Sequence, residues 1–548
     1  MSRSTSETIV NDWSMTPWRK LERNVLKIQK RIYRAAQRGD RRSVRRLQGL
    51  LTRSWSAKMI AVRQVTQQNQ GKKTAGVDGV IALKPSERRS LVKQLRVNDG
   101  KKGRPTRRVW IPKPGRDEKR PLGIPTMYDR ALQGLVKIAL EPEWEAVFEA
   151  NSYGFRPGRG CHDAIEAIFN CIARKPKWVL DADIAKCFDR IDHKALLQKL
   201  NSTSPVRKKI REWLKAGVMD RDAYQPTYAG TPQGGVISPL LANIALHGME
   251  MAVKGVVPVG KVTQRELGVV RYADDFVVIH KNREVIEQAK EVISKWLAGV
   301  GLELKPEKTR VAHTLEGQEP GFDFLGFNVR QYKVGKNRSG KSGKGYRTLV
   351  KPSNKSIKTH REKLKAVIES HKAASQAALI SKLNPIIRGW CNYYRTVVSK
   401  EVFGELDHYL WEITWGWAKR RHPNKTGAWV AKKYWKAEGG RQWNFMDSKG
   451  IKLILHSETE IVRHVKVKGT ASPMNGNLVY WSKRLRQSPM ISSRVIKLMG
   501  RQKGKCNHCG MTFRDGDRWE VDHIIPKSAL HILGMMPTHA HNLNWLVV

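Results

Sequence analysis

The chain has 548 residues, of which 40% are apolar, and its 102 Lys and Arg outnumber its 49 Asp and Glu, giving a formal charge of +53 at pH 7. This length allows several domains with a sizeable core. So large a positive excess, spread over the whole sequence, would make the folded chain repel itself. It therefore excludes a protein that acts without an anionic partner, and it predicts nucleic-acid binding.

Further features bear on the cellular compartment. No uninterrupted apolar run approaches the ~20 residues of a membrane-spanning helix, and the segment Met1 to Glu7 is too polar for a signal peptide. Four of the six Cys are scattered, as is typical of reduced cytosolic thiols, whereas Cys506 and Cys509 form a C-x-x-C pair. These features predict a cytoplasmic protein without a membrane partner.

The N-terminal region is predicted to be helical and basic. From Pro17 to about Arg38 an apolar stripe recurs at helical spacing, with Thr16 as N-cap and Pro17 as first residue. After Gly39-Asp40 a second helix follows. The apolar positions are Leu21, Val25, Ile28 and Ile32 in the first helix and Val44, Leu47, Leu50 and Leu51 in the second. The opposite faces are more basic than packing alone explains.

Residues Arg107 to Thr126 are rich in Pro and Gly, which predicts a strand, a basic turn and a second strand. The Lys and Arg side chains at the tip are either solvated or opposite phosphate groups, whose geometry bidentate Arg matches. The segment after Asp129-Arg130 is predicted to be helical, and another helix is predicted to begin near Asp163.

A buried strand is predicted from Lys177 to Ile184, and it contains two acids. Asp181 and Asp183 are two residues apart, so their side chains share one face of a strand. An acid inside a buried apolar run is costly unless it is paired or bound to a metal ion.

Two more acids occur between Gly268 and His280. Apolar residues flank Tyr272-Ala-Asp-Asp275, which predicts two short strands joined by a tight turn. Taken alone, Asp274 and Asp275 are explained equally well as acids that cap a hairpin. If this hairpin lies beside the strand that carries Asp183, the three carboxylates could hold two Mg²⁺ ions about 4 Å apart, an arrangement that serves phosphoryl transfer.

The remaining segments differ in composition. Residues Gly230 to Asn243 form a glycine-rich turn entering an apolar helix, either a plain cap or a place where backbone approaches a nucleotide. Residues Gly335 to Lys344 are predicted to be a flexible basic loop. Residues Ser353 to Trp435 are predicted to be mostly helical, with a first helix near Ile357 to His371, and Lys436 to Gly500 is predicted to be strand-like.

Two of these stretches, Asp183-Ile-Ala-Lys-Cys-Phe188 and Tyr272-Ala-Asp-Asp275, resemble palm motifs of reverse transcriptases. The wider pattern, Asp-Ile-x-x-x-Phe-Asp-x-Ile-Asp-His, is similar to the group II intron-encoded proteins. The resemblance implies an α+β fold: a right-hand polymerase (fingers and palm) with a helical N-terminal extension, an α-helical thumb (domain X), a small DNA-binding segment and a ββα-type HNH-like tail.

The resemblance also implies roles for individual residues. Asp183, Asp274 and the backbone of Ile184 would be metal ligands for two Mg²⁺ ions, and Asp275 would complete the acid cluster. Phe188 would be a steric gate that collides with a ribose 2′-OH and so favours dNTPs. The implied nucleotide-binding residues are Lys113, Arg120, Phe188, Gln233 and Lys308.

The same resemblance implies a division of the chain. The implied parts are the N-terminal extension 1–80, the fingers and palm 81–345, the thumb 346–435, the DNA-binding segment 436–500 and the HNH-like segment 501–548. A helical bundle with an aromatic core explains most rings of the thumb equally well.

The C-terminal segment resembles an HNH endonuclease through Cys506-Asn-His-Cys509 and Glu520-Val-Asp-His523. The resemblance implies His523 as general base, Asp522 as ligand of a divalent ion and Asn542 as the residue that orients His523. Cys506 and Cys509 would bind Zn²⁺ only with a second ligand pair, and no second Cys pair is present. The sequence is as consistent with a truncated or degenerate module as with one that cleaves DNA.

Together these features predict a group II intron-encoded reverse transcriptase and maturase. It would bind group II intron RNA, assist its splicing and copy it, by target-primed reverse transcription, into target DNA with dNTPs. It would associate with the nucleoid when bound to DNA, and its oligomeric state is left open, a dimer included. The alternatives are an RNA-binding splicing maturase with little polymerase activity and a reverse transcriptase of another bacterial lineage.

Overall fold

A four-stranded antiparallel sheet, the central sheet, carries the acidic stretches. The computed structural model describes residues 13–81, 83–112, 119–200, 202–258, 266–335, 345–482, 484–485, 493–507, 509–513, 520–523 and 544–547. The strands of the central sheet lie in the order β6 (Gly268–Tyr272), β7 (Asp275–His280), β3 (Trp178–Asp183) and β8 (Arg310–His313). The predicted strand and the predicted two-strand hairpin are therefore confirmed.

The central sheet is buried on both faces. Along β3 and β7, Leu180 and Val278 join one hydrophobic core, whereas Val179 and Val277 join a second core on the opposite face. The first core includes helix α14 (Arg283–Ala298), and the second includes α7 (Cys161–Ile172). This burial explains why both strands are nearly continuous apolar runs rather than alternating ones.

A second sheet contains the predicted basic hairpin. Its order is β2 (Lys119–Ile124), β1 (Thr106–Pro112), β4 (Val218–Asp220) and β5 (Ala223–Gln225). Strands β1 and β2 pair antiparallel from Arg107↔Ile124 to Pro112↔Lys119, which confirms the strand–turn–strand prediction. The turn itself, residues 113–118, lies outside the described residues.

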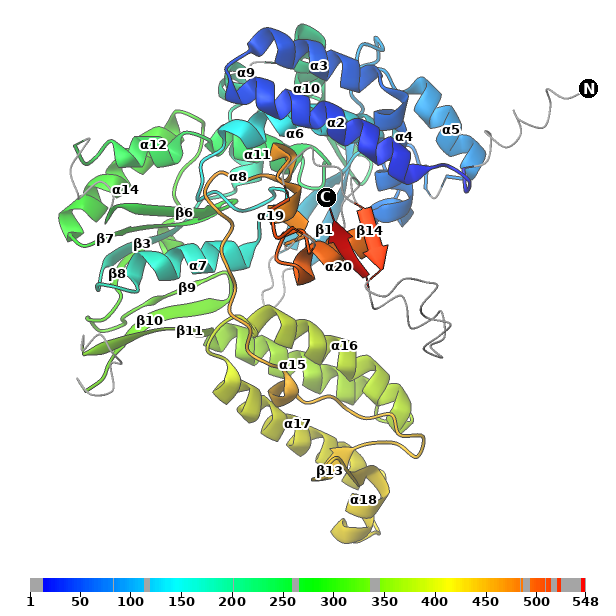
Figure 1. Ribbon diagram of the computed structural model, residues 1–548, viewed down its shortest axis with the longest axis vertical. Helices are drawn as coiled ribbons and strands as arrows, with labels where there is room; N and C mark the ends of the chain where they lie inside the picture. The colour runs from blue at the N-terminus through cyan, green and yellow to red at the C-terminus, as the bar shows by residue number, and fades with distance from the viewer. Residues whose placement is uncertain are drawn as a thin grey trace, which may run out of the picture.

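The predicted N-terminal helices are confirmed as α2 (Trp18–Gln37) and α3 (Arg41–Arg53), followed by α4 (Trp55–Arg63) and α5 (Pro85–Gln94). Helices α2, α3 and α4 pack on α6 (Met127–Val147), at the top of Figure 1. Two details of the prediction are wrong. Pro17, not Thr16, is the N-cap, and Leu50 is 45% exposed because the buried face of α3 runs through Val44, Leu47 and Leu51.

Short helices connect the sheets. They are α8 (Cys187–Arg190), α9 (His193–Lys199), α10 (Ser204–Leu214), α11 (Ser238–Leu246) and α12 (Met249–Lys254). Helix α11 follows the glycine-rich turn, as predicted, and all its residues except Pro239 are buried. Helix α7 begins at Cys161, two residues before the predicted position.

A third sheet leads into a helical arm. Strands β9 (Phe322–Phe324), β10 (Phe327–Lys333) and β11 (Tyr346–Pro352) lie in the order β11-β10-β9. Helices α15 (Asn354–Ser370), α16 (Gln376–Tyr394), α17 (Lys400–Arg420) and α18 (Gly427–Tyr434) form the arm below the body in Figure 1. The mostly helical prediction is confirmed. Of the predicted loop, residues 336–344 lie outside the described residues.

The strand-like prediction for Lys436 to Gly500 is wrong beyond the first hairpin. After β12 (Trp435–Glu438) and β13 (Arg441–Phe445) come 3-10 turns, α19 (Leu478–Ser482) and α20 (Ser493–Arg501). The segment from His456 to Ser482 returns from the arm to the body and bonds to side chains there rather than to a sheet. Asp163, for example, accepts hydrogen bonds from His464, the Val467 backbone N–H and Arg484.

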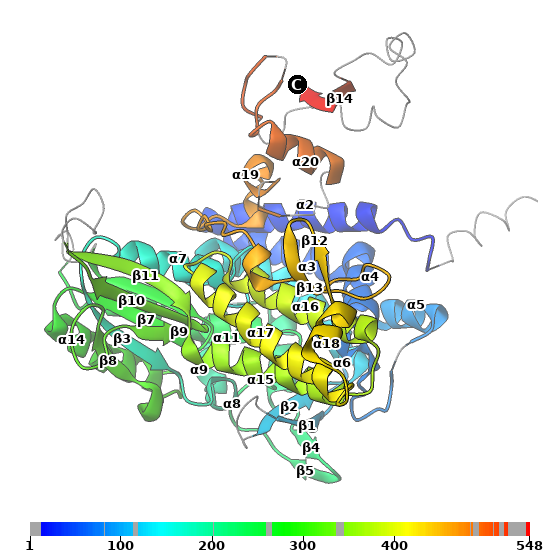
Figure 2. The same ribbon diagram turned by 90° about the horizontal axis from the view of Figure 1, so that it is seen from below.

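The C-terminal strands β14 (Glu520–His523) and β15 (Asn544–Val547) pair antiparallel. Figure 2 shows α19, α20 and β14 on the opposite face of the molecule from β1, β2, β4 and β5. Within the described ranges, no helix is both long enough and apolar enough to cross a membrane.

Candidate active site

The register of the central sheet brings the three predicted acids together. Asp183, the last residue of β3, lies directly opposite Asp275, the first residue of β7. Asp274 belongs to the two-residue turn between β6 and β7, and its carbonyl accepts a hydrogen bond from the Ile184 backbone N–H at 3.3 Å. Three carboxylates from sequence positions about ninety residues apart therefore converge at one edge of the sheet.

The tight turn is held by residues outside the acidic motifs. Ala273 has a φ of 57°, which an L-residue adopts only at some cost. A Cβ on Gly154 would meet the Ala273 backbone nitrogen at 2.4 Å, so only glycine fits there. Arg271 donates to the Ala273 carbonyl at 3.2 Å and to Asn243 Oδ1 at 3.1 Å. Asn243 in turn donates to the Gly154 carbonyl at 2.8 Å.

The Arg271 side chain, on β6, is buried, and the Glu149 carboxylate lies near its guanidinium group. The guanidinium and the carboxylate approach to 3.9 Å, and His247 lies 3.1 Å from the same carboxylate. Burial opposes ionisation of Glu149, but the hydrogen bond and charge of His247, with the charge of Arg271, lower its pKa to about 2. The turn thus rests on a buried charged network.

The loop before α7 is fixed by a second buried ion pair. Arg156 contacts both carboxylate oxygens of Glu145, at 2.8 and 3.1 Å, and both side chains are 1% exposed. Arg156 also donates to the carbonyls of Glu149 and Ser152. The backbone of this loop pairs with Arg271, because Tyr153 N–H donates to the Arg271 carbonyl and Arg271 N–H to the Asn151 carbonyl.

Replacing Glu145 by Gln is expected to destabilise this region by ~3–5 kcal/mol, because it leaves a buried guanidinium without its counter-charge. Hydrogen exchange of residues 145–156 would measure the local effect. The matched control is Glu287→Gln, which breaks an exposed i,i+4 pair with Arg283 on α14 and should cost less than ~0.5 kcal/mol. Equal protection in both variants would contradict this account.

The clustered acids repel one another. Burial, together with the charges of Asp274 and Asp183, raises the pKa of Asp275 to about 7. Burial and the charge of Asp183 also raise the pKa of Asp274. Asp181, on the same face as Asp183, has its pKa raised to about 7 by burial, with further contributions from Asp323 and Asp183.

This donor set fits Mg²⁺. A divalent cation would relieve the repulsion, and Mg²⁺ takes only one or two carboxylates from a protein, completing its shell with water and substrate phosphates. Among the described residues, no group of three or more His, Cys, Asp or Glu side chains could hold one ion by itself. Lys308 forms an ion pair with Asp183.

A fingers-side cavity of about 1100 Å³ opens in front of the acids. Besides Asp183, Asp274 and Asp275, four predicted residues line it: Arg120 on β2, Phe188 on α8, Gln233 in the glycine-rich turn, and Lys308. The Phe188 ring meets Phe155 edge-on at 6.1 Å. Lys113 lies outside the described residues.

This cavity is rich in cations that sequence reasoning missed. Its further cationic lining residues are Arg108, Lys119, Lys186, Lys305 and Lys355. Asp189 also lines it, and Gln233 Nε2 lies 3.4 Å from both of its carboxylate oxygens. These residues come from distant segments, so no local pattern could have grouped them.

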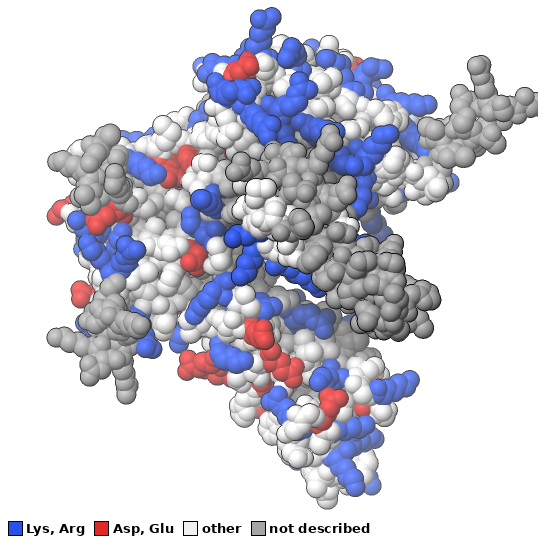
Figure 3. All heavy atoms as spheres, viewed as in Figure 1, with Lys and Arg blue, Asp and Glu red and all other residues white. Residues whose placement is uncertain are grey.

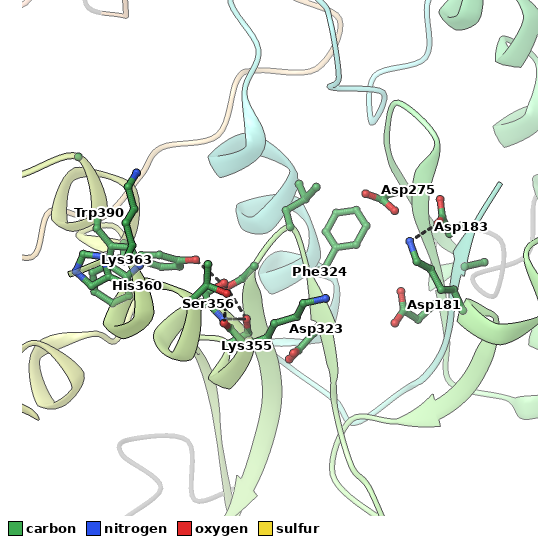
Figure 4. A pocket seen from close by; sticks show the side chains of 18 of the residues that line it. Asp181, Asp183, Asp275, Asp323, Phe324, Lys355, Ser356, His360, Lys363 and Trp390 are labelled. Carbon is green, nitrogen blue, oxygen red and sulfur yellow. Dashed lines mark hydrogen bonds and ion pairs between the residues drawn. The ribbon is translucent and has the colours of Figure 1, made fainter. Parts of the chain in front are cut away.

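A thumb-side cavity of about 1110 Å³ lies on the other side of the acids (Figure 4). Asp181, Asp183 and Asp275 line one end, Lys363 and Trp390 of the arm line the other, and Lys355 lies between them. The two cavities share Asp183, Asp275, Lys308 and Lys355. The acids therefore lie at the junction of the two cavities.

The arm is docked at the turn between β9 and β10. Tyr393 donates to the Leu325 carbonyl at 2.9 Å and Tyr394 to the Gly326 carbonyl at 3.1 Å. Gly326 has a φ of 81°, and a Cβ there would meet Ser356 Oγ and Tyr394 Oη at 2.9 Å. This docking places the helical arm against the thumb-side cavity.

Comparison with known proteins assigns three parts of the chain. Residues 111–329 match the family model described as reverse transcriptase (RNA-dependent DNA polymerase). Residues 13–95 match the N-terminal domain of reverse transcriptase, and residues 357–435 match the group II intron, maturase-specific domain.

Individual relatives agree. The chain is 32% identical over 324 residues to protein YkfC of Escherichia coli (strain K12), covering 52% of this chain and 83% of the relative. It is 28% identical over 424 residues to the group II intron-encoded protein LtrA of Lactococcus lactis subsp. cremoris, covering 63% and 69%. The chain belongs to the group II intron-encoded reverse transcriptases. It is an RNA-directed DNA polymerase and a maturase.

A solved structure of apo telomerase from Candida tropicalis also matches, with 16% identity, a TM-score of 0.33, and coverage of 41% of this chain and 53% of the other. That score is too low to establish a shared fold. The reverse transcriptase fold rests instead on the family match and on the sheets and helices described above.

The HNH-like residues of this reverse transcriptase are only partly described. Asp522 and His523 lie on β14, with His523 opposite Asn544, and Asn542 is outside the described residues. The Cys509 backbone N–H lies 3.5 Å from Cys506 Sγ, and within the described residues neither cysteine forms a disulfide. The nuclease and zinc assignments stay predictions.

Proposed function

We propose that Asp183, Asp274 and Asp275 form the polymerisation site of this reverse transcriptase. The primer 3′-OH would lose its proton to water and attack the α-phosphate of a dNTP, forming the O3′–P bond while the bond from the α-phosphate to the bridging oxygen breaks and pyrophosphate leaves. Asp183, Asp274 and the Ile184 carbonyl would hold two Mg²⁺ ions, which when bound stabilise negative charge on the reacting phosphate. The convergence of the three acids between two cavities carries this proposal.

The chain's own side chains would position the nucleotide. Arg120 and Lys308 line the fingers-side cavity, where their charges can bind a triphosphate, and Lys113 is proposed to do the same. Phe188 lines the same cavity and would exclude a 2′-OH. Gln233, held near Asp189, would lie beside the nascent base pair.

The primer–template duplex would occupy the thumb-side cavity. Lys355 and Lys363 of α15 can pair with its phosphates, and Phe324 of β9 faces the same space. Figure 3 shows Lys and Arg side chains over the N-terminal helices and along the junction between body and arm. We propose that intron RNA binds to these basic surfaces. The same RNA molecule could then be spliced and copied.

We also propose that the segments 436–500 and 501–548 support copying at a DNA target. Extension of a DNA primer on group II intron RNA by the purified chain tests the polymerase. Splicing of the same intron RNA at low Mg²⁺ tests the maturase.

A replacement of Lys355 and Lys363 by Gln is expected to weaken primer–template binding by about tenfold, with a smaller salt dependence. The control is Lys290→Gln/Lys295→Gln on α14, and equal binding by both variants would contradict the assignment of the duplex.

A further inference from the structure

A third cavity, of about 580 Å³, adjoins the fingers-side cavity. It is lined by Lys194 of α9, by Arg207, Arg211 and Lys215 of α10 and its C-cap, and by Thr227 and Tyr228 after β5. Thr227 lines the fingers-side cavity as well. The third cavity and the thumb-side cavity share no lining residue. The order in space is therefore thumb-side cavity, acids, fingers-side cavity, third cavity.

The third cavity is strongly cationic. Its four cations face a single carboxylate, that of Asp192, which accepts a hydrogen bond from the Ala195 backbone N–H at the start of α9. Lys209 on α10 pairs with Asp99 and Glu212, whereas no ion pair between the four lining cations and a carboxylate occurs among the residues that the structure describes. Arg207 Nε is buried there without a hydrogen-bond partner in the same described residues.

An exposed aromatic ring stands beside these cations. Tyr228 is 84% exposed, the most exposed large hydrophobic side chain in the described part of the chain. Cations that follow a phosphate backbone, combined with an aromatic ring on which a base can stack, are the features that bind single-stranded nucleic acid without sequence preference. A double helix would leave the face of Tyr228 without a base to stack on.

We propose that the third cavity holds the single-stranded template ahead of the nucleotide that is being copied. The inference rests on the proposed polymerisation site. If the duplex lies on the thumb side of the acids, the uncopied template must approach them from the fingers side, where this cavity lies. Lys194, Arg207, Arg211 and Lys215 bind the template phosphates, and Tyr228 stacks on one unpaired base.

The length of the template overhang provides the test. We compare primer extension by the wild-type chain, Arg211→Gln/Lys215→Gln and Tyr228→Ala on templates with a single-nucleotide overhang or an overhang of about ten nucleotides. Each variant should raise KM for the long-overhang substrate by about tenfold and change the short-overhang KM by less than about twofold. In the double variant the salt dependence of long-overhang binding should fall in slope by about 1.4.

Matched variants separate this role from general effects. Tyr228→Phe keeps the ring and should behave as wild type, and Lys290→Gln/Lys295→Gln on α14 removes the same charge from another surface. Tyr228 is almost fully exposed, so its replacement should leave folding intact. Equal losses on both overhangs, no loss on either, or a loss confined to intron RNA binding would overturn the proposal. A wild-type chain that extends neither substrate would instead refute the polymerisation site itself.

Discussion

Replacing Asp274 and Asp275 together by Asn is expected to lower dNTP incorporation on an RNA template by about 10³-fold or more, equivalent to ~4 kcal/mol of transition-state stabilisation. The reason is that Asn keeps the size of the side chain but cannot supply the negative charge that holds Mg²⁺. Single-turnover primer extension measures the loss. Binding of intron RNA should stay within about twofold, because neither acid belongs to the basic surfaces.

The same variant should not be less stable than the wild-type chain. Because the pKa of Asp275 is raised from 3.8 to about 7, the folded chain holds this proton more tightly than the unfolded chain. Ionisation therefore reduces stability as the pH rises from about 4 to about 7. At pH 8, without divalent ions, the thermal midpoint of the variant should equal or exceed that of wild type. Full activity in the variant would refute the catalytic assignment, and unfolding at pH 8 would refute the account of repulsion.

Replacing Phe188 by Ala is expected to raise ribonucleotide incorporation relative to deoxyribonucleotide incorporation by about 10²-fold, or ~3 kcal/mol of lost discrimination. The Phe188 ring is partly buried against the first core, lines the fingers-side cavity beside the acids, and is braced by Phe155. Its removal opens space where a 2′-OH would otherwise collide. The measurement is the ratio of kcat/KM for dNTP and rNTP on one primer–template.

Phe188→Tyr serves as the matched control, because it keeps a ring of the same width in the same place. This variant should retain discrimination within about threefold. If Phe188→Ala lowers dNTP incorporation without admitting ribonucleotides, Phe188 supports the fold of α8 and is not a gate. If both variants discriminate as wild type does, another residue excludes the 2′-OH.

Local patterns predicted most of the secondary structure near the site. The apolar runs on either side of Asp274 and Asp275 predicted the β6–β7 hairpin, and the Pro/Gly spacing of Arg107 to Thr126 predicted the β1–β2 hairpin. Helix periodicity predicted α2 and α3. The prediction failed beyond Phe445, because the extended segment there bonds to a side chain instead of a strand: the His464 ring and the Val467 backbone N–H both contact Asp163, about three hundred residues earlier in the chain.

The sequence alone predicted nucleic-acid binding and placed three acids in strand and turn positions, because net charge and short-range periodicity can be read without knowing which distant residues meet. Only the tertiary structure decided that Asp183 lies opposite Asp275 and that Gly154, Asn243 and Arg271 hold the turn. It also decided which cations line each cavity. Strand register and close packing join residues that are remote in the chain, and their pairing depends on burial on both faces of the central sheet.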